Sequence, residues 1–363
     1  MSSDVGERRV TLQSIADALG VSRTTVSNAY NRPDRLSRQL QERILETARE
    51  LGYAGPDPIA RQLRTGQRSA VGLVLTDSLP FAFNDEAAVG FLHGLATACE
   101  TAHMPLMLIP VTSDRDGGVA QIEQAAVDSM VVYSVPDRAP YVDAVLRKNI
   151  PVVVVDGPKD LPHTSWAGLD QLGSSALTAK HLADLGHREV GVLCHRLSDE
   201  PYVGHVDDER LSRATYPVQR ERVIGFRDEF LRLVGDGARV HVTERRVSDI
   251  PSGRSGARAI LRDFPDVTAI VCTCDALALG VLATARELGL RVPEDLSVTG
   301  FDDIPSAAGA GLTTIWQPLA EKGEVAGEMV LGNANTAASR HETLPTRLMV
   351  RETTAAARHG RVR

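Results

Sequence analysis

From Ser69 onward, short apolar runs alternate with segments of helical periodicity in two successive series. The first series includes the runs AVGLVLTDS, PLMLIPV, DSMVVYSV and IPVVVVD, and the second begins near Leu172 and includes REVGVLC and TAIVCTC. Runs that are apolar on both faces are typical of parallel strands covered by helices on both sides. The pattern predicts an α/β body of two similar subdomains, each built on a parallel, doubly wound sheet.

Two such subdomains in tandem leave a cleft between them, and ligands of these sheets bind beyond the carboxyl ends of the strands. Aspartates follow several predicted strands, one arginine begins a helix, and two phenylalanines follow the first strand. Our candidates for ligand binding are therefore Asp156, Arg222, Asp275, Asp302, Phe81 and Phe83. Each polar candidate also has a simpler explanation, because a strand-end aspartate often caps the next helix and a helical arginine often faces solvent. For Asp275, capping the segment ALALG is a sufficient role.

Residues 10–53 form a separate unit of three short amphipathic segments. Gly20 ends the first segment, and Ser22 and Ser37 are suited to cap the second and third helices. Apolar residues recur with the spacing of one buried face in each helix. The predicted core positions are Leu12, Ile15, Ala16, Leu19, Val26, Ala29, Tyr30, Leu40, Ile44, Ala48 and Leu51.

The second of these segments also has a polar face that does not contribute to the predicted core. Arg23, Thr24, Ser27 and Asn28 share this face, and Arg, Asn and Thr are side chains that contact base edges in the major groove. Residues 1–68 contain 11 Arg, no Lys and 8 Asp or Glu, a formal charge of +3, although the whole chain has −7. A basic surplus favours contact with phosphates. The unit is predicted to bind DNA, and a generic three-helix surface module is the alternative.

Over nearly its whole length, the chain resembles the lactose-repressor (LacI) family of bacterial transcription regulators. The motifs that support the resemblance are LGVSRTTVSNAYN in the head, PDPIARQL after it, and HLADLGHREVGVL, RERVIGF, PEDLSVTGFDDIP, LTTIWQP and LMVRETT in the body. The resemblance implies base contacts from Arg23, Thr24 and Asn28. It also implies phosphate contacts, which orient the head without specifying sequence, from Thr11, Ser22, Ser27, Asn31 and Ser37.

Between head and body, Asp57 can cap a helix and Pro58 suits its first position. A helix of about two turns is marginal in water without a partner, so we expect it to form mainly on DNA. The resemblance implies a hinge helix that enters the minor groove beside its dimer mate through Ala60 and Leu63, with Leu63 wedged between base steps. The alternative is a flexible linker, and Asp57 stands where the family usually has Asn.

The resemblance further implies three chain crossings between the subdomains and an effector site that includes Asp156, Arg222 and Asp302. Carboxylates and a guanidinium can hydrogen-bond the hydroxyl groups or the base edge of an effector. No aromatic residue occurs in residues 247–254, where family members often have one that stacks on the ligand, which argues against simple sugar stacking.

These observations give a division of the chain into five parts. We expect a helix-turn-helix domain over 1–54, a hinge over 55–68, an N-subdomain over 69–158 with about 294–318, a C-subdomain over 159–293 with about 319–352, and a disordered tail over 353–363. The segment 198–219 is longer than the usual loop before the arginine helix. Its polar and aromatic residues suit a lid or a metal cluster, but spacing selects neither, and a solvated loop is the simplest interpretation.

Several classes of function lack their motifs. Cys99, Cys194, Cys272 and Cys274 do not have zinc-site spacing, so we expect no metal and no cofactor. We find no nucleophile with an orienting base, no phosphate-binding glycine loop and no HExxH motif, so we expect no enzyme. The chain has no long apolar run and does not begin with a secretory signal, so we expect a cytoplasmic, nucleoid-associated protein without a membrane partner.

The sequence thus predicts a repressor that binds a pseudo-palindromic operator in double-stranded DNA. We expect a homodimer or tetramer whose DNA affinity is controlled by a small-molecule effector that is a sugar, a nucleoside or purine-like. The alternative is a sugar- or nucleoside-binding protein, or an enzyme, of the same core fold.

Overall fold

The computed structural model describes residues 11–31, 35–51, 70–111, 117–332 and 339–357, and the chain divides into two units after Arg68. The first unit contains the head, and the second is the body. Ala60 and Leu63, for which we predict a hinge helix, lie outside the described residues. Among the described helices, none is long and apolar enough to cross a membrane.

The head consists of α1 (Leu12–Leu19), α2 (Arg23–Asn31) and α3 (Arg38–Glu50) around one small core. Gly20 ends α1 in the left-handed conformation, with a φ of 66°. The Ser22 hydroxyl accepts a hydrogen bond from the Thr25 amide at 3.0 Å, and the Ser37 hydroxyl accepts one from the Leu40 amide at 3.4 Å. Both predicted caps are therefore confirmed. The fully buried core residues are Ile15, Ala16, Val26, Ala29, Ile44 and Ala48.

Leu51 does not belong to this core, contrary to the prediction. It follows the last residue of α3 and is 40% exposed. The helical spacing that connected it with Ala48 ends with the helix at Glu50, so its side chain is not directed toward the other two helices.

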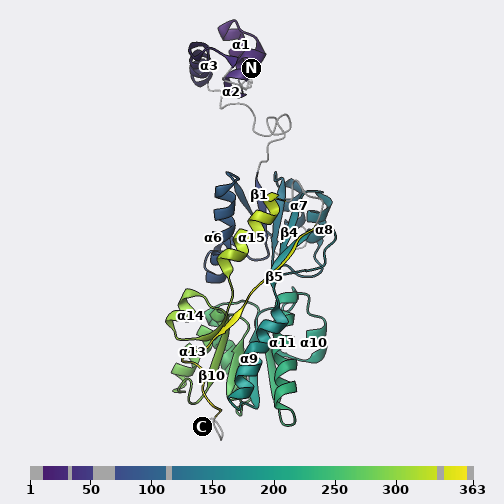
Figure 1. Cartoon of the computed structure of the whole chain (residues 1–363), viewed down its shortest axis with the longest axis vertical. Coiled ribbons are helices and arrows are strands. Elements are labelled where there is room, and N and C mark those ends of the chain that lie inside the picture. Colours follow the sequence, from purple (N-terminus) through teal and green to yellow (C-terminus); the bar gives the residue numbers. More distant parts are fainter. Residues whose placement is uncertain (1–10, 32–34, 52–69, 112–116, 333–338, 358–363) are drawn as a thin grey trace, which may run out of the picture. The chain divides into compact units, whose positions relative to one another are not determined.

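The N-subdomain of the body is built on a six-stranded parallel sheet with the order β12-β5-β4-β3-β1-β2. Its strands are β1 (Val71–Leu75), β2 (Leu106–Pro110), β3 (Ser129–Tyr133), β4 (Val152–Val155), β5 (Ser165–Leu169) and β12 (His341–Leu344). Its helices are α5 (Leu79–Ala82), α6 (Glu86–Thr101), α7 (Gly117–Gln124), α8 (Pro140–Arg147) and α15 (Leu319–Gly332). Figure 1 shows α6 and α15 side by side. Gly94 and Gly323 allow this close approach, because a Cβ atom at either position would collide with the backbone of the other helix.

The C-subdomain is built on a seven-stranded sheet with the order β13-β11-β10-β9-β6-β8-β7, in which only the edge strands β7 and β13 pair antiparallel. Its strands are β6 (Glu189–Cys194), β7 (Gly204–Val206), β8 (Arg239–Glu244), β9 (Ala269–Cys272), β10 (Ser297–Asp302), β11 (Thr313–Trp316) and β13 (Arg347–Met349). Its helices are α9 (Gln171–Asp184), α10 (Asp208–Ser212), α11 (Pro217–Val234), α12 (Ile250–Asp263), α13 (Asp275–Glu287) and α14 (Pro305–Gly309). The predicted pair of doubly wound subdomains is thus confirmed.

The points at which the chain crosses between the subdomains differ from the prediction. The first crossing follows β5 rather than residue 158, because Ser165 pairs with Val153 of β4. The strand β10 stays in the C-subdomain, because Ser297 pairs with Ala269 of β9, so the predicted return of 294–318 to the N-subdomain is wrong. The second crossing follows Gln317. Because α15 packs on α6 and β12 pairs with β5, residues 319–344 belong to the N-subdomain, and the third crossing leads from β12 to β13.

The predicted disorder from residue 353 is also wrong for residues 353–357. The Val298 amide donates to the Thr353 carbonyl at 2.8 Å, and the Ala357 amide donates to the Leu185 carbonyl at 2.8 Å. Thr353 is 4% exposed. These backbone hydrogen bonds hold the segment against the C-subdomain, whereas residues 358–363 lie outside the described part of the chain.

Candidate functional site

A cavity of about 110 Å³ lies between the two subdomains, at the carboxyl ends of strands from both sheets. Four of the predicted effector contacts line it, namely Phe81, Asp156, Arg222 and Asp302. Phe83 does not line it and is 58% exposed, because it follows the short helix α5, which turns Phe81 rather than Phe83 inward. The prediction of Phe83 as a wall of the cleft is therefore wrong.

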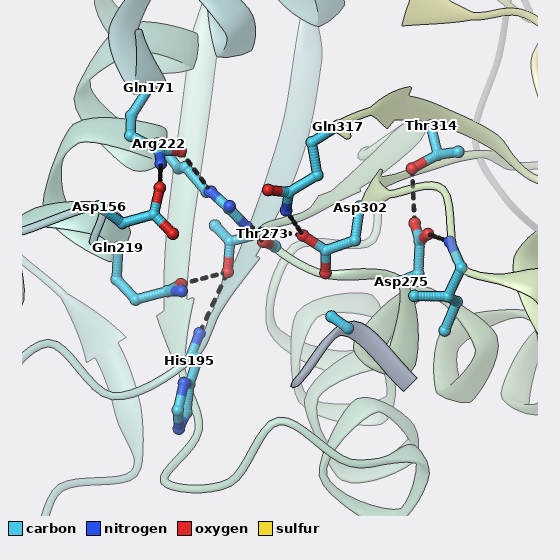
Figure 2. A network of polar contacts seen from close by, with 12 residues as sticks. Asp156, Gln171, His195, Gln219, Arg222, Thr273, Asp275, Asp302, Thr314 and Gln317 are labelled. Atoms are coloured by element: carbon cyan, nitrogen blue, oxygen red, sulfur yellow. Dashed lines mark hydrogen bonds and ion pairs between the residues drawn. The ribbon is translucent and has the colours of Figure 1, made fainter. Parts of the chain in front are cut away.

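Asp275 does not line the cavity either, and it is fully buried. Its carboxylate accepts a hydrogen bond from the Thr314 hydroxyl at 2.6 Å (Figure 2) and one from the Ile304 amide at 3.0 Å. Burial, followed by the charge of Asp302, raises the pKa of this carboxyl well above its usual range. The hydrogen bonds of Asp275 therefore hold the start of α13 against β11 and the loop after β10, and Asp275 does not line the cavity in which an effector would bind.

The backbone is unusual where the strands reach the cavity. Ser134, Asp156, Asp302 and Asp303 follow or end β3, β4 and β10, and their φ angles are 49°, 64°, 121° and 56°. Non-glycine residues seldom adopt such angles, which cost free energy and tend to occur at functional sites. Here the unusual backbone directs the Asp156 and Asp302 side chains into a shared polar network.

Arg222 on α11 is the centre of this network (Figure 2). Its Nε donates to Gln171 Oε1 at 2.9 Å, and its Nη1 donates to the Thr273 carbonyl at 2.7 Å and to Asp302 Oδ1 at 3.3 Å. The guanidinium also lies 3.5 Å from the centre of the Phe301 ring. Arg222 and Asp302 are each 6% exposed, so this is a buried ion pair with several additional hydrogen bonds.

Lys322 on α15 closes the network into a ring. Its Nζ donates to Asp156 Oδ2 at 2.6 Å and to Gln317 Oε1 at 2.8 Å. Gln317 Nε2 in turn donates to Asp302 Oδ1 at 2.6 Å, and Gln171 Nε2 lies 3.4 Å from Asp156 Oδ1. The ring joins α15 and the end of β4 in the N-subdomain to α9, α11 and the end of β10 in the C-subdomain.

Sequence reasoning missed Lys322, Gln171 and Gln317. A signal for Lys322 exists, because it occupies the buried face of α15 at the i, i+4 and i+7 spacing with Ala326 and Met329. Lysine at such a position is almost never fully buried unless it is paired. The two glutamines have no comparable local signal.

Four carboxylates line the cavity, and three of them pair with a cation: Asp77 with Arg196, Asp156 with Lys322 and Asp302 with Arg222. The fourth, Asp85, caps α6 by accepting a hydrogen bond from the Ala87 amide at 3.0 Å, and no cation is paired with it among the described residues. Burial, followed by the charge of Asp302, raises the pKa of Asp85 to about 6. Burial also raises the pKa of Asp302, which Arg222 opposes.

The arrangement is suited to binding rather than to covalent chemistry. Burial lowers the pKa of His195 to about 3, so its imidazole is neutral at pH 7, and its Nε2 lies 3.1 Å from the Arg246 carbonyl. Burial also raises the pKa of the Cys274 thiol well above its usual value, so it is not a thiolate. None of the hydrogen bonds described at the cavity joins a serine or cysteine to a histidine. The part of the chain that the structure describes also has no cluster of three or more His, Cys, Asp or Glu suited to a metal ion.

In the head, the predicted base-contacting residues lie on α2, where Arg23 and Thr24 are exposed and Asn28 is half-buried. Three of the predicted phosphate contacts are N-terminal caps, because the hydroxyl of Thr11 caps α1 as those of Ser22 and Ser37 cap the other two helices. The remaining two, Ser27 and Asn31, lie within α2.

A three-helix head with polar caps and a polar face, followed by two subdomains around a polar cavity, defines a DNA-binding regulator with a ligand-binding body. Residues 11–55 match the family described as bacterial regulatory proteins, lacI family, and residues 179–354 match a periplasmic binding protein-like domain. The HTH-type transcriptional regulator Rv3575c of Mycobacterium tuberculosis is 45% identical over 96% of this chain and 97% of that protein. The chain belongs to the LacI family of bacterial transcription regulators.

Two further similar proteins come from Corynebacterium glutamicum. Its HTH-type transcriptional regulator IpsA is 42% identical over 88% of this chain and 90% of that protein. The crystal structure of a LacI family transcriptional regulator from the same species shares 36% identity, with a TM-score of 0.73 over 97% of this chain and 100% of that chain. These relatives agree with a regulatory function rather than an enzymatic one.

Proposed function

We propose that this regulator is a repressor that binds a pseudo-palindromic operator as a homodimer and changes its DNA affinity when a small polar molecule occupies the cavity. The observation that supports this most strongly is the presence, in one chain, of an exposed polar face on α2 and a cavity lined by paired charges. In the cell it acts in the cytoplasm, at the nucleoid.

Operator recognition depends on the two kinds of polar residue in the head. Arg23, Thr24 and Asn28 contact base edges, because they lie in the first two turns of α2, where a recognition helix enters the major groove. The helix caps Thr11, Ser22 and Ser37 lie at helix N-termini, where hydroxyl and amide groups are suited to phosphates, and Ser27 and Asn31 add phosphate contacts from α2. Ala60 and Leu63 complete the interface in the minor groove.

The effector binds among Phe81, Asp156, Arg222 and Asp302, which supply one apolar wall and three charged groups. The cavity is confined, with a volume of about 110 Å³. This favours a ligand with the size of one sugar ring or one purine base over a larger molecule, which would require the cleft to open.

Dimerisation is supported by apolar residues that are exposed on the N-subdomain. Met107 on the edge strand β2 is 38% exposed, Val89 on α6 is 41% exposed, and Phe83 before α6 is 58% exposed. An edge strand has unpaired backbone groups that a partner can cover. Sedimentation of the full chain over a range of concentrations tests the homodimer against a tetramer.

The test of the proposed function is a mobility-shift titration with DNA from upstream of the protein's own gene. We expect specific binding that is lost when Arg23 and Asn28 are both replaced by alanine, while Arg138→Ala on the exposed surface of the body leaves it unchanged. A thermal-shift screen of sugars, nucleosides and purines identifies the effector, because a ligand that binds the folded state raises its melting temperature. Binding with equal affinity to all DNA sequences contradicts the proposal and favours the alternative of a small-molecule binding protein or enzyme.

A further inference from the structure

The long segment between β6 and α11 is folded, contrary to the simple interpretation as a solvated loop. Within it, β7 pairs antiparallel with β8 and extends the sheet of the C-subdomain. Helix α10 follows, with the Asp207 carboxylate accepting a hydrogen bond from the Arg210 amide at 2.8 Å. The segment is thus a small substructure with its own strand and helix.

Both ends of the segment are fixed at Leu197. The amides of Thr215 and Tyr216 donate to the Leu197 carbonyl at 2.8 and 3.1 Å, and the Leu197 amide donates to Glu244 Oε1 at 2.9 Å. Arg210 binds both oxygens of the same carboxylate, at 2.6 and 2.9 Å. Glu244 is fully buried at the end of β8, so the segment is anchored to the sheet next to the cavity.

This anchor fixes the position of Arg196, the residue just before Leu197. Arg196 Nη1 lies 2.9 Å from Asp77 Oδ1, and its Nη2 donates to Thr76 Oγ1 at 3.1 Å. Its guanidinium lies 4.9 Å from the centre of the Tyr216 ring, whose hydroxyl donates to Asp199 at 2.7 Å. Thr76 and Asp77 follow β1 in the N-subdomain, whereas Arg196 follows β6 in the C-subdomain, so these contacts cross the cleft.

A second contact across the cleft starts from the same segment. The Asp137 amide of the N-subdomain donates to the Thr215 carbonyl at 2.7 Å, and Arg220 Nη1 donates to the Asp137 carboxylate at 2.7 Å. Arg220 also donates to the Ala214 carbonyl at 2.8 Å. The segment therefore holds the N-subdomain at two points that are far apart along the chain.

We infer that residues 197–216 form a strut that positions Arg196, and that Arg196 holds the cleft closed through Asp77 and Thr76. Arg196 also lines the cavity, and its Nε is buried without a hydrogen-bond partner among the described residues. Arg196 thus has a place in the wall of the cavity as well as in the contact that closes the cleft.

The distance between the subdomains tests this inference on the full chain without DNA or effector. Spin labels on cysteines introduced at the exposed positions Gln121 and Asp236 report the distance by pulsed electron resonance, because all four native cysteines are buried. The labelled protein is diluted with an excess of the same variant without labels, so that the distance within one chain dominates. We expect one narrow distribution for the parent and a second, longer distance for Arg196→Met. Asp77→Asn is the more conservative variant and should show the same longer distance, which keeps the test decisive if Arg196→Met does not fold.

Three further variants sharpen the result. The double variant Arg196→Met/Asp77→Asn should open the cleft no further than Arg196→Met alone, because that substitution already removes the contact with Asp77. Tyr216→Leu should also open it, because it removes the ring beneath Arg196. Arg213→Ala is the matched control, since it removes an arginine of the same segment whose pair with Glu209 is exposed, and should retain the parent distribution.

Unchanged distances in both Arg196→Met and Asp77→Asn contradict the inference that Arg196 holds the cleft closed. If the cleft opens in these two variants but not in Tyr216→Leu, residues 197–216 do not position Arg196, although Arg196 still holds the cleft closed. Because the distances are measured without DNA, neither result affects the proposed function. A failure to bind operator, in turn, does not affect the inference that Arg196 closes the cleft.

Discussion

Replacing Lys322 with methionine should destabilise the body by about 3–5 kcal/mol, the usual cost of removing one partner from a buried ion pair. Lys322 is 1% exposed and lies between Asp156 at 2.6 Å and Gln317 at 2.8 Å. Methionine fills much of the same volume, so the loss arises from the carboxylate that it leaves without a cation. The Asp156 carboxylate then retains only the 3.4 Å contact with Gln171 on its other oxygen within the ring.

Urea unfolding followed by tryptophan fluorescence measures this loss in the full chain. Both tryptophans, Trp166 and Trp316, belong to the body, so the signal excludes the head. The protein concentration is kept constant, because dimerisation affects apparent stability. Lys180→Met is the control, since Lys180 pairs with Asp184 on the surface of α9 and such pairs contribute only about 0.3–0.5 kcal/mol.

A second substitution separates charge from packing. Asp156→Asn in the Lys322→Met background removes the unpaired carboxylate and should restore most of the lost stability. A loss of less than about 1 kcal/mol for Lys322→Met refutes the reasoning, because it falls below the range for a broken buried pair. A further loss on adding Asp156→Asn refutes it as well.

Three other predictions concern the head, the hinge and the cavity. Arg23→Ala should relax the base preference at one base pair of each half-site, at a cost of about 1–3 kcal/mol in binding to the correct sequence, whereas Ser37→Ala should weaken binding to all sequences alike. Selection of binding sites from randomised DNA measures both effects. An unchanged motif for Arg23→Ala would contradict the prediction. Leu63→Ala should reduce operator affinity and DNA bending without affecting dimerisation, which gel assays of bending would show. DNA bending equal to that of the parent would indicate that the hinge only connects head and body. Because burial raises the pKa of Asp85 to about 6, the folded state binds this proton more tightly than the unfolded state, and stability falls as pH rises from about 4 to about 6. Asn is also a good helix cap, so Asp85→Asn should raise the free energy of unfolding by about 1–3 kcal/mol at pH 7 and by little at pH 4. Equal gains at both pH values in urea unfolding would contradict the raised pKa of Asp85.

The head was predictable because its determinants are local. Ser22 and Ser37 precede helices whose apolar periodicity is visible within about ten residues, and Gly20 supplies a left-handed turn. The same holds for the alternation of strands and helices in the body. Leu51 shows the limit, since spacing cannot locate the last turn of a helix to within one residue.

The crossings between the subdomains were not predictable in the same way. The strand β10 pairs with β9, the strand that precedes it in the chain, so the local succession of strands agrees with the C-subdomain, whereas the resemblance placed β10 in the N-subdomain. Apolar strands of the two sheets look alike. The pattern therefore defines how many strands exist more reliably than it assigns them to a sheet.

The site was predictable in part. Asp156, Asp275 and Asp302 are equivalent in the sequence, because each lies at a strand end. In the structure, two of them have a positive φ and reach the cavity, whereas Asp275 begins a helix and is bound by Thr314. Lys322 completes the ring with a partner 166 residues away, a distance over which a single sequence provides no signal.

The central claim is that the cavity and the DNA-binding head are thermodynamically linked. It is tested most directly by measuring the operator Kd with and without the effector found in the thermal-shift screen, and the effector Kd with and without operator. The account predicts that both ratios are the same factor, since linkage is reciprocal, and that Arg222→Ala weakens effector binding while leaving the operator Kd without effector unchanged. An operator Kd that does not change at saturating effector would contradict it.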